Sequence, residues 1–302
     1  MQSAQPAKDN DLQIAFLLLV HRPPDLANRF IQQLSKISNA DVYVHIDRKN
    51  FEAVSSKLFS TERVKVIKDS IDVKWADISQ VEATLRLLRN AVDSGKKYDF
   101  VILKSGQDLM IRRPLEDYLI QNRNKIFMNA HRIEDNSPQS YFWKIKWPKI
   151  ARKQYDAPLH PFRMLRAVLI RLYKLGINAM PNPNKLPFNV YRGSEWFCIP
   201  GYIAEHILAF IEKNEWYYEA FKNALASDEY FFQTIIMNSP FAKDNVCNNL
   251  THIRFGQTHR DKNHPVILTM NDVTEIESSG KFFARKFDED VDSTVIDYFC
   301  NK

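Results

Sequence analysis

The chain has 302 residues, 45% of them hydrophobic and 26% charged, a composition ordinary for a globular protein with a substantial core. The net charge of +6 is modest, and the sequence shows no recognisable module in which basic residues and interleaved aromatics bind a nucleic acid, which argues against nucleic-acid binding. The seven glycines are too scattered for the glycine-rich loops that cradle phosphates, so any phosphate must be held by side chains or helix N-termini.

The first third of the chain is predicted to alternate strands with helices. Residues 14–20 form a continuous apolar run, typical of a strand that is covered on both faces. A helix follows through residue 37, and Asp25 is its expected N-cap. The later elements are strands at 41–46, 64–67 and 100–103 and an amphipathic helix at 79–91. This alternation predicts an α/β fold with a mostly parallel central sheet flanked by helices.

Polar residues follow three of these strands. His21 comes after the first strand and Asp47 after the second, and the fourth runs into a turn at 105–108 that begins with Ser105. Ligands of such sheets bind beyond the carboxyl ends of the strands. We therefore expect these residues to lie together at one rim of the sheet.

Residues 124–190 break the alternation and are predicted to form a helical insertion. They contain a basic amphipathic helix at 163–175, with apolar residues at positions 164, 165, 168, 169 and 172. Such a helix is either a surface helix of the insertion or a membrane-surface contact near a lipid-linked substrate. After the insertion, helices are predicted at 201–213 and around 228–236.

The cysteines and the N-terminal segment indicate a reducing compartment. Cys198, Cys247 and Cys300 are far apart and show neither a C-x-x-C pair nor metal-ligand spacing. The apolar run at 14–20 is too short to cross a bilayer and lacks a small-residue cleavage site. We expect a cytoplasmic protein, with possible peripheral contact at the inner face of a membrane.

The Ser-Asp-Glu segment at 227–229 precedes an aromatic run that leads into a helix. Ser227 is a predicted N-cap, and acidic residues in the first turn favour the helix dipole, so capping alone accounts for the segment. Alternatively, Glu229 is a partly desolvated general base beside the aromatic residues. The residue types do not decide between these two interpretations.

Two further segments combine charged and aromatic residues. Glu195 and Trp196 suit a sugar, which presents an apolar ring face and hydroxyls, but a buried Trp beside a solvated Glu fits the pattern equally. Arg285 and Lys286 are either solvated cations or the partners of a diphosphate. The acidic run at 288–292 contains Asp-x-Asp but lies at the wrong end of the chain for a metal site, so we expect no metal and no other cofactor.

Taken together, these segments resemble the core-2/I-branching β-1,6-N-acetylglucosaminyltransferases and peptide O-xylosyltransferases of glycosyltransferase family 14. The resemblance covers most of the chain and rests on the opening strand ending at His21, VYVHIDRK at 42–49, the helix with ISQVEATLRLL that follows Trp75, ILKSGQD at 102–108, GSEWFCI at 193–199, SDEYFFQTI at 227–235 and FFARKFDEDVD at 282–292. One such segment would be a weak signal, whereas seven in the family's order are a specific one.

The resemblance implies a GT-A-like fold and inverting, metal-independent transfer of GlcNAc or xylose from a UDP-sugar to a hydroxyl of a glycan or lipid-linked saccharide. Glu229 matches the family's catalytic base, and Lys286 matches the lysine that contacts the donor diphosphate. The other expected donor-binding residues are His21, Asp47, Trp75, Ser105 and Arg285, and the expected acceptor-binding residues are Glu195, Trp196 and Asp228.

We expect one glycosyltransferase domain over residues 1–302, with a nucleotide-sugar-binding half at 12–123, an insertion at 124–190 and an acceptor and catalytic half at 191–302. Animal members of the family carry a membrane anchor, a stem and many disulfides that this sequence does not show, so we expect it to resemble a compact bacterial-type member.

The sequence departs from the family pattern at one position. The family places a second cation on the diphosphate, and the matching position here is Val266, which Arg260, Lys262 or Arg285 would have to replace. The alternative is a catalytically impaired member of the fold that binds sugar or nucleotide. A third interpretation is a peripheral membrane scaffold whose basic helix is the functional part.

Overall fold

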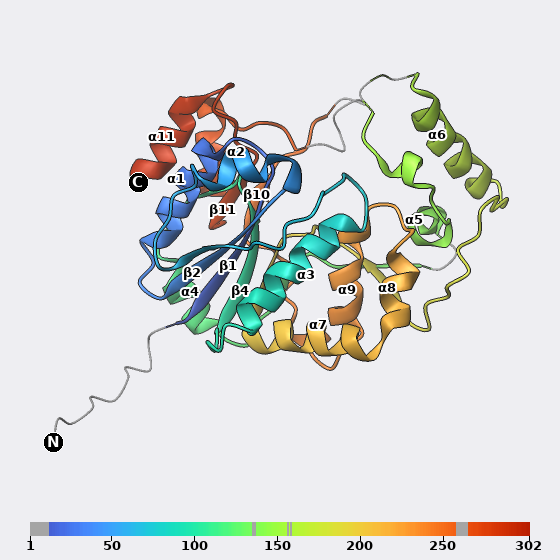
Figure 1. The fold of residues 1–302 in the computed structure, drawn as a ribbon, viewed down its shortest axis with the longest axis horizontal. Coiled ribbons are helices and arrows are strands. Elements are labelled where there is room, and N and C mark those ends of the chain that lie inside the picture. The colour runs from blue at the N-terminus through green and yellow to red at the C-terminus, as the bar shows by residue number, and fades with distance from the viewer. Residues whose placement is uncertain (1–11, 135–136, 156, 158, 258–264) are drawn as a thin grey trace.

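A central sheet with helices on both faces forms the body of the protein (Figure 1). The structure, a computed structural model, describes residues 12–134, 137–155, 157, 159–257 and 265–302. Within these ranges the main sheet has six strands in the order β3-β2-β1-β4-β9-β6. Their bounds are β1 (Ile14–Val20), β2 (Ala40–Ile46), β3 (Val64–Val66), β4 (Phe100–Ser105), β6 (Phe127–Met128) and β9 (Phe197–Pro200).

The first four strands of this sheet are mutually parallel, whereas β9 is antiparallel to both β4 and β6. The predicted mixed α/β fold with a mostly parallel sheet is therefore confirmed. Two smaller sheets complete the described strands, one of β10 (Thr251–Ile253), β11 (Phe283–Arg285) and β5 (Leu109–Met110) and one of β7 (His131–Ile133) and β8 (Val190–Arg192).

Strand β1 is buried on both faces, as its continuous apolar sequence predicts. Alternate residues point to opposite sides, so Phe16 and Leu18 enter one core and Ala15 and Leu17 the other. The first core is shared with α1 (Pro24–Ser35) and α11 (Ser293–Asn301), and the second with α3 (Ser79–Val92) and α7 (Gly201–Lys213). The remaining helices are α2 (Phe51–Ser55), α4 (Leu115–Gln121), α5 (Tyr141–Lys144), α6 (Pro161–Lys174), α8 (Glu215–Phe221), α9 (Phe231–Met237) and α10 (Val273–Ser278).

Two predicted N-caps are wrong. Pro23 caps α1, and Asp25 lies inside its first turn. Ser227 begins a 3-10 turn (Ser227–Glu229) that precedes α9, and its buried hydroxyl donates to the carbonyl of Phe221 at 2.9 Å. Ala226 occupies the cap position in a left-handed conformation, with φ of 54°. Ser227 thus anchors the segment to the end of α8 and leaves Asp228 and Glu229 on the turn.

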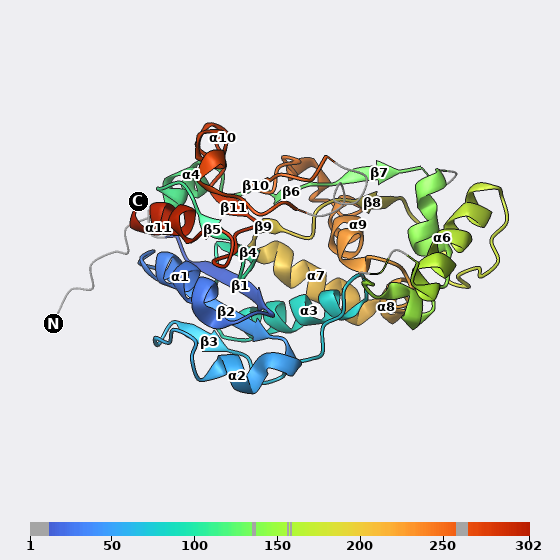
Figure 2. The ribbon, with the colours of Figure 1, turned by 90° about the horizontal axis from the view of Figure 1, so that it is seen from above.

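The predicted basic helix is present as α6, at the end of the molecule opposite α1 and α11 in both views (Figures 1 and 2). Its apolar residues do not share one face. Leu169 is buried in a small core with Trp147 and Ala76, whereas Met164 and Val168 are exposed. None of the helices in the described ranges has the length and apolar content needed to cross a membrane.

Candidate active site

The carboxyl ends of β1, β2 and β4 lie side by side. Leu19 of β1 is in register with His45 of β2 and with Ser105 of β4. His21 and Asp47 follow these ends directly, and the Asp47 amide donates to the carbonyl of Val20 at 2.8 Å. The structure therefore brings the residues expected at the rim to one edge of the sheet.

Glu229 lies next to this edge, and one of its carboxylate oxygens is held by Arg192. Both Nε and Nη2 of Arg192 donate to Oε2, at 2.8 and 2.6 Å. The other oxygen, Oε1, has no hydrogen-bond partner among the described residues. About a third of the Glu229 side chain is exposed (34%). The carboxylate is thus oriented by a cation and keeps one oxygen available to a ligand.

The chain at Gly193 is packed too closely for any larger residue. A Cβ at this position would lie 1.6 Å from the backbone oxygen of Asn129. The Gly193 amide donates to the carbonyl of Glu229 at 2.9 Å. This close approach sets the segment that carries Glu195 and Trp196 directly against the turn that carries Glu229.

Aromatic rings surround the ion pair of Glu229. The Arg192 guanidinium lies 4.6 Å from the ring centre of Phe142 and 5.7 Å from that of Tyr230. Tyr230 is fully buried, and burial raises the pKa of its hydroxyl. The faces of these two rings help to hold the guanidinium in place.

The carboxyl groups of Glu195, Asp228 and Glu229 influence one another in this part of the site. Desolvation of the half-buried Glu195 raises its pKa to about 7, against the opposing positive charge of Arg285 and with the help of Glu229 and Asp108. The pKa of Asp228 is also raised, first by desolvation and then by Glu195 and Glu229. Burial and mutual repulsion therefore both favour the protonated forms of Glu195 and Asp228.

Arg285 connects the acidic cluster to the cations of the rim. Its guanidinium lies 4.2 Å from the ring centre of Trp196, and its Nε is 3.6 Å from Oδ1 of the buried Asp108. Behind Asp108, the fully buried Lys104 donates to Oγ1 of Thr251 at 2.7 Å and lies 4.5 Å from the ring centre of Phe283. Arg285 is therefore fixed between Trp196 and Asp108.

Lys286 and Arg22 place positive charge at the rim, next to His21. Desolvation lowers the pKa of Lys286, and the positive charge of Arg22 lowers it further. The pKa of His21 is also lowered, to about 4, first by desolvation and then by the positive charges of Lys286 and Arg22. Arg22 itself pairs with Asp288 at 2.6 Å. Lys286 and Arg22 thus form a cationic pair at the end of β1, beside a His21 side chain whose lowered pKa leaves it neutral near pH 7.

The other expected donor-binding residues lie differently. Asp47 is buried, caps the turn Arg48–Asn50 and accepts from the amide of Lys49. Ser105 is buried in its turn, where its Oγ accepts from the amide of Gln107 at 3.0 Å. Trp75 is exposed and carries the guanidinium of Arg166 at 5.3 Å from its ring centre. Contact of these three with a donor stays a prediction.

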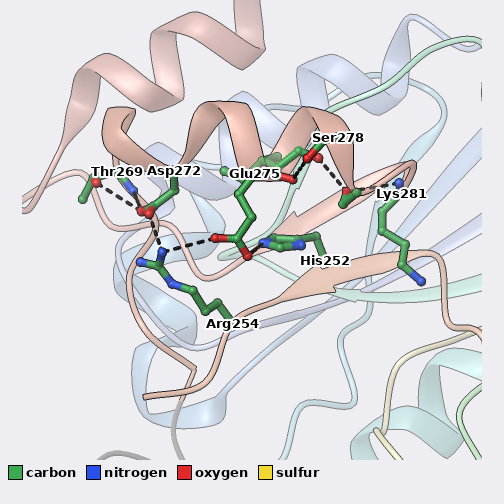
Figure 3. Close-up of polar contacts among 9 residues, drawn as sticks. His252, Arg254, Thr269, Asp272, Glu275, Ser278 and Lys281 are labelled. Carbon is green, nitrogen blue, oxygen red and sulfur yellow. Dashed lines mark hydrogen bonds and ion pairs between the residues drawn. The ribbon is translucent and has the colours of Figure 1, made fainter. Parts of the chain in front are cut away.

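Val266 stands where the family has a second cation for the diphosphate, and hydrogen bonds tie the backbone around it to neighbouring segments. Val266 donates its amide to the carbonyl of Arg254, and the amide of Leu268 donates to the carbonyl of Lys286. Arg254 pairs with Asp272 at 2.5 Å and with Glu275 at 3.5 Å (Figure 3), so its charge is already neutralised. Arg260 and Lys262 lie outside the described residues.

Sequence reasoning missed several polar residues of this site. Arg22 had a usable signal, since it follows His21 at the end of the first strand. Arg192 had none, because it acts through Glu229, which is 37 residues away in the sequence. Lys104 and Asp108 stand in the segment ILKSGQD at 102–108, and Asp108 ends the turn expected at the rim, but their contacts with Thr251 and Arg285 could not be read from that segment. Within the described part of the chain, no group of three or more His, Cys, Asp or Glu side chains is placed to hold a metal ion.

Residues 14–278 match the family model of the Core-2/I-Branching enzyme. The chain belongs to this family. The predicted family and the predicted enzyme class, a glycosyltransferase, are thereby confirmed.

The relatives of this family member include xylosyltransferases. A xylosyltransferase of Ciona intestinalis is 24% identical, in an alignment that covers 95% of this chain and 34% of that protein. Xylosyltransferase 1 of Mus musculus is 28% identical, with 80% of this chain and 24% of that protein covered. The chain thus spans about a third of the length of the first relative and about a quarter of the second.

A crystal structure of mouse xyloside xylosyltransferase 1 in its apo form superposes with a TM-score of 0.34 at 12% identity, covering 76% of this chain and 83% of that chain. A similarity this low bears on neither fold nor function.

Proposed function

We propose that this member of the Core-2/I-branching family is an inverting glycosyltransferase that moves a sugar from a UDP-sugar to a hydroxyl of a glycan or lipid-linked saccharide. The observation that carries the proposal is the carboxylate of Glu229, which Arg192 holds by one oxygen while the other has no partner among the described residues. The neighbouring cations at Arg285 and Lys286 supply the second requirement of such a reaction, a site for a departing diphosphate.

In the proposed reaction, Oε1 of Glu229 accepts the proton of the acceptor hydroxyl. The hydroxyl oxygen forms a bond to the anomeric carbon while the bond from that carbon to the diphosphate oxygen breaks. Attack from the face opposite the leaving group inverts the configuration. Trp196 offers an apolar surface to an acceptor ring, and the protonated member of the Glu195 and Asp228 pair donates a hydrogen bond to an acceptor oxygen.

The diphosphate that departs carries developing negative charge, which Lys286 stabilises with Arg285. Arg22 is our candidate for the cation absent at Val266, because its charge acts on both Lys286 and His21. About half of the Arg22 side chain is exposed, whereas its partner Asp288 is only 12% exposed, so we propose that a diphosphate competes with this carboxylate for Arg22. Because Arg22, Arg285 and Lys286 together can neutralise the diphosphate, we propose that the reaction needs no divalent metal. We also propose, from the family, that the fold is GT-A-like.

The xylosyltransferase relatives support xylose as the donor sugar, and the family description supports GlcNAc. UDP release from UDP-xylose and UDP-GlcNAc, each with a panel of saccharide acceptors, tests both. We expect release that depends on acceptor with at least one donor, and unchanged rates in excess EDTA. Complete loss in EDTA that manganese restores would overturn the metal-independent mechanism.

Val266 favours one alternative function, a sugar- or nucleotide-binding protein that has lost catalysis. Calorimetry separates it from the enzyme. UDP binding without turnover of any donor, in the presence of acceptor, would support the alternative. Turnover by an Arg22→Met variant at the wild-type rate would remove Arg22 from its proposed place.

We propose that the protein acts in the cytoplasm, in peripheral contact with the inner face of a membrane where a lipid-linked acceptor would lie. The exposed apolar residues of α6 support this part of the proposal.

A further inference from the structure

The positive charge of the chain is concentrated in one segment. Residues 137–190 contain ten Lys and Arg residues and a single acid, Asp156, a net charge of +9. Because the whole chain carries +6, the remainder is net negative at −3. A charge segregated in this way gives one part of the molecule an attraction for anionic surfaces that the rest lacks.

The same segment exposes large apolar side chains. On α6, Met164 is 51% exposed and Val168 is 52% exposed, and Leu175 directly after the helix is 70% exposed. Together with the exposed Arg171, these residues follow the spacing of one helical face, three or four positions apart. The opposite face of α6 packs through Leu165 and Leu169 on Trp147. The helix is therefore apolar on two sides, and one of them has no partner among the described residues.

Because the exposed surface of α6 combines apolar residues with cations, it does not suit every anionic partner equally well. A soluble polyanion such as a nucleic acid or acidic polysaccharide gains from the cations but not from Met164, Val168 and Leu175. A second copy of this chain would bring two surfaces of the same high charge together. The boundary between headgroups and acyl chains of an anionic bilayer satisfies both kinds of residue at once.

The inner side of the helix that bears this surface is packed against the segment that precedes the turn of Glu229. Arg166 of α6 lies over the ring of Trp75. The neighbouring Ala76 accepts, through its carbonyl, the amide of Ala226 at 3.0 Å, one residue before the turn of Glu229. Ala76, Leu225 and Leu169 belong to one small core. The helix that would contact a bilayer through its outer face therefore packs, through its inner face, on the residues that directly precede the turn of the proposed base.

We propose that the outer face of α6, defined by Met164, Val168, Arg171, Lys174 and Leu175, docks the protein on the surface of an anionic lipid bilayer. Binding to lipid does not depend on the reaction. Its use, to bring a lipid-linked acceptor to Glu229, rests on the proposed function.

Co-sedimentation of the full chain with vesicles tests the docking surface. We expect binding to phosphatidylcholine vesicles with about a third phosphatidylglycerol and at least tenfold weaker binding to phosphatidylcholine alone. Binding should fall as salt rises from about 0.1 M to 1 M, since the screening length falls from about 10 Å to about 3 Å. Met164→Ser/Val168→Ser/Leu175→Ser and Arg171→Glu/Lys174→Glu should each weaken binding about tenfold or more.

Matched controls separate this surface from general effects. Val246→Ser/Val291→Ser removes exposed apolar residues elsewhere, and Lys57→Glu/Lys97→Glu makes the same change in net charge on exposed loops. Both controls should bind as the wild type does. Equal binding to both kinds of vesicle, or no effect of the α6 variants, would overturn the proposal.

Two further outcomes would also overturn it. Binding to heparin that only the charge variant weakens would indicate a soluble polyanion. A dimer in sedimentation that the serine variant dissolves would indicate a second copy. Since vesicle binding is measured without donor, and turnover of a soluble acceptor without vesicles, failure of the docking and failure of the reaction are distinguishable.

Discussion

At the scale of single residues, the position of the Glu229 carboxylate depends on Arg192. The two hydrogen bonds from Arg192 reach the same oxygen, and the guanidinium in turn rests on Phe142 and Tyr230. A proton acceptor must be placed within a fraction of an ångström to work. Arg192 is therefore a positioning residue, which acts through Glu229.

Replacing Arg192 tests this dependence. Arg192→Met should lower kcat by about ten- to a hundredfold, because the carboxylate loses its orientation. UDP affinity should stay within twofold of the wild type, since Arg192 lies with the acidic cluster and apart from Lys286. Arg192→Lys should restore part of kcat. A purely structural role is indicated instead if Arg192→Met lowers UDP affinity and the melting temperature as much as kcat.

The residues of the site differ in how far sequence could predict them. Glu229, Lys286 and the Glu195–Trp196 pair stand in segments that resemble the family, and the strand-end rule places His21 and Asp47 at the rim. The N-cap assigned to Ser227 was wrong because a Ser before acidic residues looks the same whether its hydroxyl caps a helix or anchors a loop. Arg192 is 37 residues from Glu229, so local pattern carries no trace of their pairing.

At the scale of elements, the buried Lys104 joins the main sheet to the C-terminal sheet. It projects from β4 and reaches Thr251 of β10 and Phe283 of β11. Among the described residues its ammonium has no carboxylate within ion-pair distance, and burial lowers its pKa to about 8. Burying this charge costs stability wherever the lysine is protonated in the folded state.

The stability lost by burying the protonated Lys104 should depend on pH. An unfolded lysine has a pKa near 10.5, so below about pH 8 both states are protonated and the full cost is present. Between pH 8 and 10.5 the unfolded state binds more protons than the folded state, and folded stability therefore rises with pH. The difference in unfolding free energy between wild type and Lys104→Met should rise by about 2–3 kcal/mol across this window.

Urea denaturation at several pH values gives this difference directly. Lys97→Met, which changes an exposed lysine, is the control and should show a flat difference from the wild type. A flat difference for Lys104→Met as well would show that the buried lysine keeps its ordinary pKa.

The positions of strands and helices could be predicted from the sequence more readily than which of their faces would be buried. The apolar run of β1 and the period of α3 predicted both elements, because each buries residues in a simple repeat. Helix α6 was predicted in place, but its apolar residues serve two sides, and a pattern of apolar positions does not tell which side has a partner. Only the packing of Leu169 on Trp147 separates the inner face from the outer one.

At the scale of the whole molecule, the site is a composite of segments from both ends of the chain. The cations Arg285 and Lys286 come from the C-terminal sheet, His21 and Arg22 from the end of β1, and Glu229 from the turn before α9. Parallel pairing of the first strands is what makes their ends coincide, so the rim was predictable. The docking of β10, β11 and β5 against that rim was not, because those strands are only two or three residues long.

The central claim is that base and diphosphate cation are separate parts of one site, and Glu229→Gln tests it most directly. A glutamine keeps the shape and can still accept from Arg192, but it cannot take the proton. We predict UDP affinity within about twofold of the wild type and a transfer rate lower by two to four decades. Lys286→Met should instead weaken UDP binding, and Glu212→Gln on the exposed face of α7 should change neither. Near-full transfer by Glu229→Gln, or loss of UDP binding together with transfer, would contradict the account.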